Sequence, residues 1–386
     1  MLTYPFVFPK ISGRLVRRLN RFVVEVEIDG RLEEAYLANP GRLWELFLPG
    51  TELLLSPALS GGRLPYTVLA CRSNDRPVLL HTHLTNKVVH RLIDEGKLTL
   101  FRDYRVVKEE PAYGRHRFDL LLEHKTSGKS YYLEIKSCTL FSGRIAMFPD
   151  AVTKRGSEHL RKLKELADGG IKTGCLFVVM NPGAEFFLPA YHIDHNFTEA
   201  FLTVKDAVQL NAVALDFDDS FTAVKTIKPL AIPFDFLENE FEDRGAYLLL
   251  IRIDRNKSLE VGSLGQIEFK QGYYVYVGSA MRGLAKRVAR HIRKKKNIRW
   301  HVDYLTAAAD KVSAVPIISS ENLECQLAGR LEKITGSPAV QGFGSSDCRC
   351  PGHLFYFAEN PLHHPGFIDL IQYFRIERLN ISRQLM

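Results

Sequence analysis

Arg117-Phe-Asp-Leu-Leu-Leu122 and Tyr131-Tyr-Leu-Glu-Ile-Lys-Ser-Cys138 are two short runs with the apolar content and alternation of β-strands. Between them lies a polar segment, residues 123–130, which contains a Ser-Gly pair typical of a turn. The two runs are therefore expected to form a β-hairpin. We expect its register to be symmetric about Thr126 and Ser127.

That register places Asp119 opposite Glu134, where cross-strand Cβ atoms lie about 4.5–5.5 Å apart on one face. Lys136 follows Glu134 by two residues and shares its face. Two carboxylates so placed can bind one hard divalent cation, Mg2+ or Mn2+. The ammonium group can stabilise charge that develops on a phosphate. The three residues predict a metal-dependent catalytic site for phosphodiester hydrolysis; a solvated strand face is the alternative, and it is the more frequent meaning of this short pattern.

The pattern of Asp119, Glu134 and Lys136 resembles that of the PD-(D/E)XK nuclease superfamily. Two longer stretches, Ala38-Asn-Pro-Gly-Arg-Leu-Trp-Glu-Leu-Phe-Leu-Pro-Gly50 and Phe148-Pro-Asp-Ala-Val-Thr-Lys-Arg-Gly-Ser-Glu-His-Leu-Arg-Lys-Leu163, resemble the sugar fermentation stimulation protein A (SfsA) family. This resemblance covers approximately the first 235 residues. It implies an OB-like module, a nuclease-like domain, and single- or double-stranded DNA as the partner.

The resemblance leaves several activities open. The acid pair favours a nuclease, because a protein that only binds nucleic acid has no need to hold two carboxylates against the phosphates. The family name points instead to a non-catalytic DNA-binding regulator of sugar-utilisation genes. An RNA-processing nuclease is a third interpretation, because OB modules bind either nucleic acid.

The overall composition is that of an ordinary globular protein. The 386-residue chain is 46% hydrophobic and 25% charged. It has no apolar run of the roughly 18 residues that a membrane span needs, and its first ten residues lack the pattern of a signal peptide. We expect a cytoplasmic protein with no membrane partner. Six cysteines in a chain of this length fit reduced thiols better than a disulfide framework.

The net charge of +8 is concentrated in residues 237–386, which hold 21 Lys/Arg against 16 Asp/Glu. Within them, Arg282 to Arg299 contains nine basic residues and no acidic one. Clustered positive charge is typical of contacts with a phosphate backbone; a solvated basic helix explains the pattern equally well. The side chains expected to bind nucleic acid here are Arg290, Arg293, Lys294 and Lys295.

Periodicity and turn signals indicate a multidomain α/β protein with a small N-terminal β-barrel. Residues 1–80 are expected to form an OB-like nucleic-acid-binding domain, with a strand at residues 21–29 and a hairpin turn at Asp29-Gly30. Residues 81–236 are expected to form the PD-(D/E)XK nuclease-like domain, and residues 237–386 a second α/β domain.

The middle domain shows the strand and helix alternation of a mixed sheet covered by helices. Helices are expected at residues 85–95, 153–167 and 196–209, and strands at residues 175–180 and 212–217. Residues 227–239, with two prolines, are expected to be a linker. Phosphates are expected to bind near the start of the second helix, at Lys154, Arg155 and Arg161.

The last domain is expected to contain strands at residues 245–253 and 272–278 and a helix at residues 283–296. The buried stripe of that helix is expected to be Leu284, Val288 and Ile292.

The triplets Gly245-Ala-Tyr247 and Tyr276-Val-Gly278, followed by Arg287 and His291, resemble the GIY-YIG nuclease superfamily. The resemblance makes residues 237–386 a GIY-YIG-like domain and implies catalytic roles for these tyrosines, Arg287, His291 and Glu324. Glu324 stands at the family's metal-binding position. A phenol needs a nearby cation to act as a base at neutral pH, and Arg287 and a metal ion on Glu324 would supply it. Half-buried strand aromatics are the alternative interpretation of the tyrosines.

Cys348, Cys350 and His353, with Cys325 elsewhere in the chain, offer four potential ligands for Zn2+. Their spacing is not that of a standard zinc motif. The sequence therefore favours buried structural thiols beside a glycine-rich turn over a zinc site.

Overall fold

The computed structural model describes residues 10–58, 63–73, 76–219, 221, 223–379 and 381. The chain separates into two compact units, residues 1–234 and residues 235–386. We refer to them as unit 1 and unit 2. Within the described part of the chain, no helix has both the length and the apolar character needed to cross a membrane.

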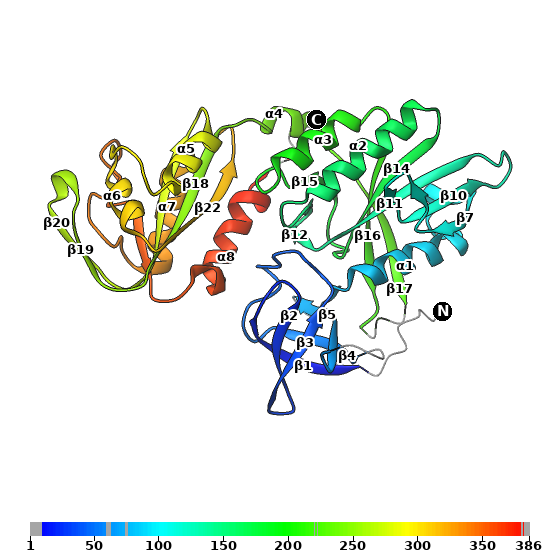
Figure 1. Cartoon of the computed structure of the whole chain (residues 1–386), viewed down its shortest axis with the longest axis horizontal. Helices are drawn as coiled ribbons and strands as arrows, with labels where there is room; N and C mark the ends of the chain where they lie inside the picture. Colours follow the sequence, from blue (N-terminus) through cyan, green and yellow to red (C-terminus); the bar gives the residue numbers. More distant parts are fainter. Residues whose placement is uncertain are drawn as a thin grey trace. The chain divides into compact units, whose positions relative to one another are not determined.

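Unit 1 begins with a closed five-strand β-barrel, as predicted (Figure 1). Five strands form it: β1 (Ile11–Arg18), β2 (Val23–Ile28), β3 (Arg31–Leu37), β4 (Glu52–Pro57) and β5 (Tyr66–Ser73). A sixth strand, β6 (Arg76–Leu79), extends the sheet. The order is β3-β2-β1-β4-β5-β6, and β3 also pairs with β5, which closes the barrel. Asp29 and Gly30 have φ of 49° and 76° and connect β2 to β3 in the predicted hairpin turn.

The rest of unit 1 is built on a mixed six-stranded sheet of order β17-β16-β14-β11-β10-β7. Its strands are β7 (Tyr104–Glu109), β10 (Leu120–His124), β11 (Ser130–Cys138), β14 (Lys172–Val179), β16 (Gln209–Phe217) and β17 (Val224–Leu230). β11, β14 and β16 are parallel. In the β10–β11 hairpin, Leu120 pairs with Leu133 and Glu123 with Ser130, which confirms the predicted register.

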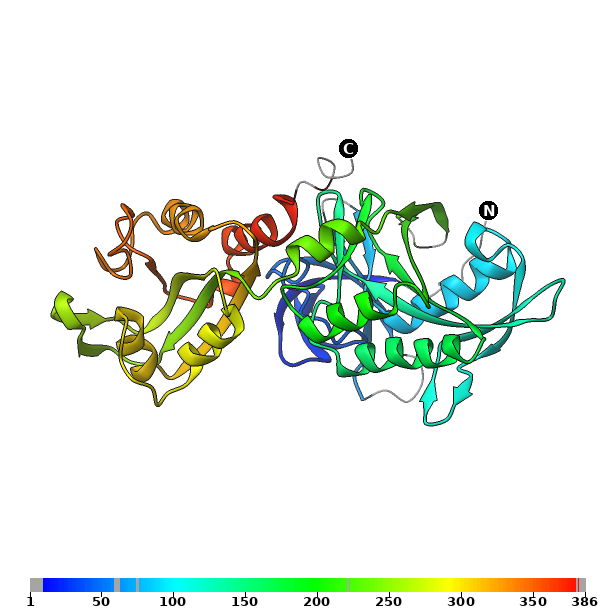
Figure 2. The same ribbon diagram turned by 90° about the horizontal axis from the view of Figure 1, so that it is seen from above.

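Helices cover both faces of this sheet (Figure 2). They are α1 (Thr82–Asp94), α2 (Lys154–Asp168) and α3 (His195–Val204). Leu176 and Val178 of β14 join the apolar cluster that contains α1 and the barrel. Phe177, between them, packs against Phe197 and Phe201 of α3. Alternate residues of β14 therefore serve two cores, which explains why the strand is one continuous apolar run in the sequence.

Smaller elements complete unit 1. They are a three-stranded sheet of β12, β13 and β15 (Leu140–Ser142, Ile145–Phe148 and Phe186–Pro189), the ribbon of β8 and β9 (Ala112–Tyr113 and His116–Arg117), and the 3-10 turn η1 (Thr99–Phe101).

Two predictions for unit 1 are wrong. The helix expected at residues 196–209 ends at Val204, and residues 209–217 are strand β16. The boundary between the two units lies within the linker expected at residues 227–239, but the expectation of a segment without regular structure is wrong, because it contains the end of β17 and the helix α4 (Phe234–Glu240). Pro229 of β17 has no backbone N–H to donate. The strand tolerates it because β17 is at the edge of the sheet and pairs with a neighbouring strand, β16, on one side.

Unit 2 contains an antiparallel sheet of order β22-β18-β21-β23. In chain order these strands are β18 (Gly245–Ile253), β21 (Gly272–Ala280), β22 (Lys311–Ile318) and β23 (Leu354–Phe357). A ribbon of β19 (Lys257–Glu260) and β20 (Gln266–Phe269) and the turn η2 (Gly262–Leu264) connect β18 to β21. The helices are α5 (Leu284–Ile292), α6 (His301–Ala308), α7 (Glu324–Thr335) and α8 (Pro365–Gln372), with η3 (Pro361–His363) before α8 and η4 (Tyr373–Glu377) after it.

The helix predicted at residues 283–296 is shorter than expected, since α5 ends at Ile292. Leu284 is buried as predicted, Val288 is half-buried, and Ile292 is 42% exposed, so the predicted stripe is wrong at its end. His291 takes the buried place instead, because Tyr247 hydrogen-bonds its ring nitrogen. The basic residues after Ile292 therefore lie in a loop.

Candidate active sites

The acid pair of unit 1 lies where the β10–β11 hairpin meets α1. Asp119 directly precedes β10, and its Oδ2 accepts a hydrogen bond of 2.6 Å from the backbone N–H of Ile135. Its Oδ1 accepts one of 2.7 Å from Nδ2 of Asn86 on α1. One carboxylate thus joins the strand to the helix. Both donors are neutral, so they hold Asp119 in place and stabilise its carboxylate but do not cancel its charge.

Glu134 of β11 is almost wholly buried, with 2% of its surface exposed. Its Oε1 is in contact with the ammonium group of Lys136 and lies 2.5 Å from Nδ1 of His159. Its Oε2 is buried and has no hydrogen-bond partner. A buried carboxylate oxygen without a donor is costly unless something positive occupies the space beside it. The donor set therefore fits a bound cation.

The charges of this site are set by burial and by the close contacts. Burial and the neighbouring Glu134 raise the pKa of Asp119 to about 6. Burial also acts to raise the pKa of Glu134, but Lys136 and His159 outweigh it and hold that pKa below its usual value. Burial acts to lower the pKa of Lys136, yet Glu134 keeps it raised. At neutral pH the site holds two carboxylates and one ammonium, a net negative charge that suits a divalent cation.

Two residues of this site were missed by the sequence analysis: Asn86 and His159. His159 is 3% exposed and lies on α2, one turn after Arg155, whose Nε donates a 3.2 Å hydrogen bond to its Nε2. That acceptor role places the imidazole proton on Nδ1, facing Glu134. The sequence signal that could have identified His159 is its position as a polar residue beside the apolar stripe of α2.

The three basic residues expected on α2 are exposed, but they do not share one face. Arg155 is linked to the acid pair through its hydrogen bond to His159. Lys154 and Arg161 are seven residues apart and share a different face of the helix. The structure thus brings one of the three, Arg155, to the acid pair through a contact.

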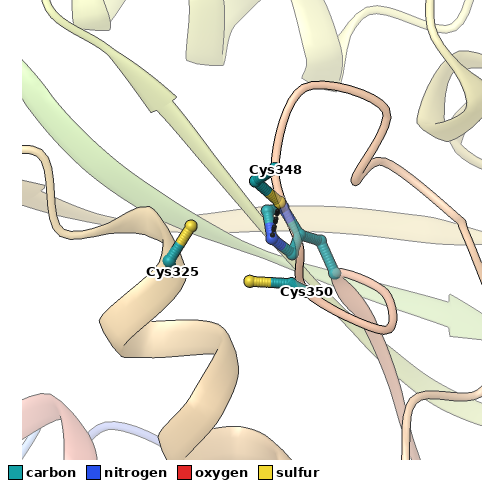
Figure 3. Close-up of side chains that lie close together, drawn as sticks. Cys325, Cys348 and Cys350 are labelled. Atoms are coloured by element: carbon teal, nitrogen blue, oxygen red, sulfur yellow. Dashed lines mark hydrogen bonds between the residues drawn. The ribbon is translucent and has the colours of Figure 1, made fainter.

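In unit 2 the three cysteines and His353 lie together (Figure 3). Cys325 is in the first turn of α7, and Cys348 and Cys350 are in the loop before β23. Cys325 is exposed and the other two thiols are half-buried, so the interpretation as buried structural thiols is wrong. The thiols converge close to the surface.

The five side chains expected to form a site in unit 2 line one cavity of about 240 Å3: Tyr247, Tyr276, Arg287, His291 and Glu324. Strand pairing brings the two triplets together, since Tyr247 pairs with Gly278 across β18 and β21. A Cβ at Gly278 would collide with the Tyr247 hydroxyl. The glycine of the second triplet is therefore what admits the tyrosine of the first.

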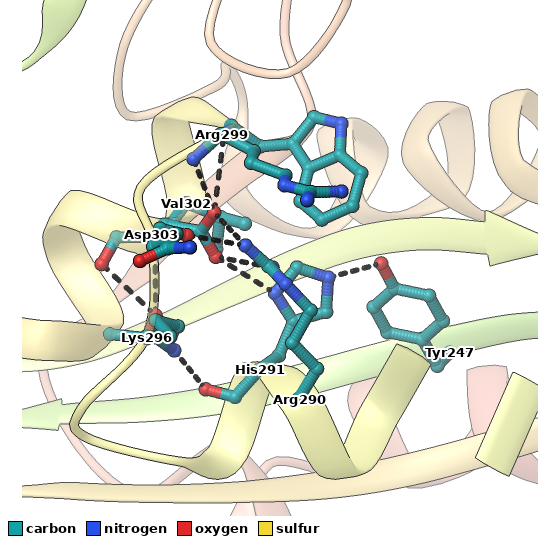
Figure 4. Close-up of polar contacts among 10 residues, drawn as sticks. Tyr247, Arg290, His291, Lys296, Arg299, Val302 and Asp303 are labelled. Carbon is teal, nitrogen blue, oxygen red and sulfur yellow. Dashed lines mark hydrogen bonds and ion pairs between the residues drawn. The ribbon is translucent and has the colours of Figure 1, made fainter. Parts of the chain in front are cut away.

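Tyr247 is the end of a polar chain that runs through His291 to Asp303 (Figure 4). The Tyr247 hydroxyl lies 3.0 Å from His291 Nε2, and His291 Nδ1 lies 3.3 Å from Asp303 Oδ1. Burial raises the pKa of Tyr247 well above its usual value, and burial lowers the pKa of His291 to about 4. At neutral pH the phenol is protonated and donates to a neutral imidazole.

Asp303, in the first turn of α6, lies behind this cavity and contacts it through His291; it was not predicted from the sequence. It is fully buried and receives a two-pronged ion pair from Arg290, with N···O distances of 3.0 and 2.9 Å. The Arg290 guanidinium also lies 4.4 Å from the ring centre of Trp300. Arg290 is thus held within the fold, whereas Arg293, Lys294 and Lys295 are exposed in the loop after α5.

Glu324, the expected metal ligand of unit 2, has a partner at each oxygen. The hydroxyl of Ser279 donates to Oε2, and Nδ1 of His353 lies 3.2 Å from Oε1. This carboxylate differs from Glu134, whose Oε2 has no donor.

Unit 1 is thus an OB-like barrel followed by an α/β domain that carries an acid pair, the buried Glu134 and the half-buried Asp119. Two family models match it: "SfsA N-terminal OB domain" over residues 16–80 and "Sugar fermentation stimulation protein RE domain" over residues 83–221. A sugar fermentation stimulation protein homolog of Pyrobaculum arsenaticum is 39% identical over 214 residues, which is 55% of this chain and 90% of the relative. The chain belongs to the sugar fermentation stimulation protein (SfsA) family.

Two further relatives cover the same part of the chain. The homolog of Methanothermobacter thermautotrophicus is 35% identical over 198 residues, 51% of this chain and 82% of that protein. The structure described as Pyrococcus furiosus SfsA in complex with Ca2+ is 29% identical, with a TM-score of 0.55, and covers 60% of this chain and 99% of its own. Unit 2 matches a different model, "Domain of unknown function DUF123", over residues 246–374.

Proposed function

We propose that the α/β domain of unit 1 is a PD-(D/E)XK-type nuclease domain that hydrolyses phosphodiester bonds of DNA with Mg2+ or Mn2+ held by Asp119 and Glu134. The observation that carries the proposal is Glu134 Oε2, a buried oxygen with no donor next to a second carboxylate. A structural carboxylate would have that oxygen satisfied by the protein.

The divalent cation, when bound, supplies Lewis-acid polarisation of the phosphate and lowers the pKa of a coordinated water. The protein's own residues position the groups around it. Ile135 and Asn86 fix Asp119. His159 and Lys136 both contact Oε1 of Glu134 and so leave Oε2 for the cation. Lys136 also brings a positive charge to the place where negative charge develops on the phosphate.

Two features of unit 1 support nucleic acid as the substrate. Arg155, linked to the site through His159, is exposed and can pair with a phosphate. On the barrel, the aromatic rings of Phe22 and Tyr36 are 43% and 40% exposed, and the Arg21 guanidinium lies 6.0 Å from the Phe22 ring centre. Exposed aromatic and basic side chains on an OB-like barrel suit the bases and phosphates of a single strand.

The relative described in complex with Ca2+ supports a hard divalent cation in this family. Ca2+ and Mg2+ both prefer carboxylate oxygens. By extension, we propose that the acid pair is the cation site of this chain as well.

We further propose that unit 2 is a GIY-YIG-like domain that binds the same nucleic acid, with Tyr247, Tyr276, Arg287, His291 and Glu324 around its pocket. Arg287 lines the cavity and gives it a positive charge for a phosphate. The neutral phenols of this pocket favour binding over catalysis.

The test is incubation of the full chain with single- and double-stranded DNA and RNA, each with Mg2+, Mn2+ or EDTA. Cleavage that requires the cation and is lost on Glu134→Gln supports the nuclease. Tight, cation-independent binding without cleavage of any substrate would instead support the alternative of a non-catalytic DNA-binding regulator of sugar-utilisation genes. Cleavage of RNA alone would make the chain an RNA-processing enzyme.

A further inference from the structure

Three thiols and one imidazole in unit 2 come together from distant parts of the chain. Cys325 lies at the N-terminal end of α7, while Cys348, Cys350 and His353 belong to the loop that precedes β23. The potential ligand atoms of all four lie within 4.8 Å of one another. His353 Nε2 is 3.5 Å from Cys348 Sγ.

This spacing is close to that of a tetrahedral zinc site. Zn–S distances of about 2.3 Å and Zn–N distances of about 2.0–2.1 Å place neighbouring ligand atoms roughly 3.5–3.8 Å apart. The ligand atoms of this cluster, at most 4.8 Å apart, exceed that separation by about one ångström, and small side-chain rotations would close the difference. Three cysteines and one histidine are a standard structural zinc set, whereas Mg2+ and Ca2+ prefer oxygen ligands. A disulfide would use only two of these four groups.

The second observation is the partner of the imidazole. Nδ1 of His353 lies 3.2 Å from Oε1 of Glu324. An ionised carboxylate only accepts, so the proton is on Nδ1 and the lone pair of Nε2 points toward the thiols. A histidine that ligates a metal usually donates its other N–H to a carboxylate or carbonyl in this way. His353 is 1% exposed, which holds the ring in this orientation.

We propose that Cys325, Cys348, Cys350 and His353 bind one Zn2+ in a structural site, with Glu324 as the carboxylate that orients His353. Each thiol releases its proton to solvent as it binds, so that the ion is held by three thiolates and a neutral imidazole.

The site joins the loop before β23 to α7, and the loop forms one wall of the tyrosine cavity. Gly344 and Asp347 of this loop line the cavity. A Cβ at Gly344 would approach the Tyr276 ring to 2.6 Å, so the loop backbone lies directly on that ring. Zinc therefore fixes the cavity wall, and Glu324 belongs both to the cavity and to the support of His353.

The metal content of the purified full-length chain tests this proposal. After growth with added zinc and purification without chelators, we expect about one Zn2+ per chain by inductively coupled plasma mass spectrometry. Cys348→Ser and Cys350→Ser should each lose most of it. Cys71→Ala, in barrel strand β5 of unit 1, should keep it, because Cys71 is a buried free thiol outside the cluster.

Two further measurements do not depend on how the cysteine variants fold. The wild-type chain reconstituted with Co2+ should show thiolate-to-metal charge-transfer absorption and the visible bands of tetrahedral cobalt. Glu324→Gln should keep the stoichiometry and weaken Zn2+ affinity by about 10–100-fold, as expected of an outer partner. A wild-type chain that carries no zinc and gives no cobalt–thiolate band would overturn the proposal, and so would iron bound at these thiols in place of zinc.

Discussion

The acid pair of unit 1 and the tyrosine pocket of unit 2 differ in whether the protein itself supplies a hydrogen-bond donor to each carboxylate oxygen. In unit 1, Glu134 leaves one buried oxygen without a donor, and the pKa of Asp119 is raised only to about 6. In unit 2, Tyr247 and His291 hydrogen-bond to each other, and each oxygen of Glu324 has a donor. The carboxylate of the first site needs a cation to complete it, whereas both oxygens of Glu324 in the second site have partners within the protein. The buried atom without a hydrogen bond in the second site is His291 Nδ1, a ring nitrogen that lies 3.3 Å from Asp303 Oδ1 and offers no anionic ligand.

The two sites, each of which resembles a nuclease motif in the sequence, therefore differ in how ready they are to bind a metal ion. A carboxylate with a pKa near 6 is ionised at neutral pH and can bind a metal ion. A phenol whose pKa is raised by burial is protonated, and a histidine with a pKa of about 4 is already neutral. Phosphodiester hydrolysis at neutral pH is therefore expected from unit 1, and phosphate binding from unit 2.

The largest effect is expected from Glu134→Gln. An amide cannot replace the anionic ligand, so cleavage should fall by far more than the roughly 100-fold that follows removal of an outer partner. Tyr247→Phe in unit 2 is the matched variant and should change cleavage little. Single-turnover cleavage of labelled DNA in Mg2+ measures both. If Tyr247→Phe abolished cleavage and Glu134→Gln did not, the roles of the two units would be reversed.

A smaller effect is expected from His159, a positioning residue that acts through Glu134. His159→Ala removes the Nδ1–H donor to Oε1 and should weaken Mg2+ affinity by about 10–100-fold. His159→Asn retains an N–H donor near the position of Nδ1 and should recover most of the affinity. The Mg2+ dependence of the cleavage rate distinguishes the two variants. Equal apparent affinities for wild type and His159→Ala would show that the imidazole only packs.

The raised pKa of Asp119 predicts a pH-dependent change in stability. A native pKa of about 6, above the unfolded value near 3.9, means that the native state loses stability as pH rises from about 4 to about 6. Asp119→Asn avoids this loss. The difference of about two pKa units corresponds to about 3 kcal/mol, so in Mg2+-free buffer at pH 7.5 the variant's Tm should exceed that of wild type by roughly 6–12 °C, and the difference should almost vanish at pH 4. Calorimetry at both pH values measures it; a difference that is constant with pH would contradict the assignment.

The smallest effect is expected in the loop after α5. Arg290 and Lys296 are bound within the fold, to Asp303 and to Thr306, whereas the consecutive residues Arg293, Lys294 and Lys295 are exposed and available to phosphates. Changing these three to Gln should reduce the slope of log K against log salt by about 0.9 for each duplex phosphate that the loop no longer neutralises. Lys162 and Lys164, which already pair with Glu165 and Asp168, are the control pair for substitution. An unchanged slope would make the loop a solvated segment.

Local patterns predicted much of this fold. The hairpin register followed from the polar segment between two apolar runs, because a one-residue slip would move every side chain to the opposite face. The strands at residues 245–253 and 272–278 followed in the same way, and their pairing then brought Tyr247 and Tyr276 to one cavity.

What the sequence did not predict depends on packing between distant elements. His159 and Asn86 reach the acid pair only because α2 and α1 pack on the sheet, and Asp303 meets His291 only through the packing of α6 against α5. The prolines near residue 230 suggested a linker because their tolerance on an edge strand depends on the strand order of the sheet. The sequence favoured structural thiols over a metal site because Cys325 lies on α7, far along the chain from the loop that holds Cys348, Cys350 and His353.

Calorimetric titration of the full chain with Ca2+ at pH 7.5 tests the difference between the two sites most directly, since it measures cation binding without catalysis. We predict about one binding site per chain, retained in Tyr247→Phe and lost in Glu134→Gln. Undiminished Ca2+ binding in Glu134→Gln would contradict the account, because the oxygen without a donor would then not be the place where the cation binds.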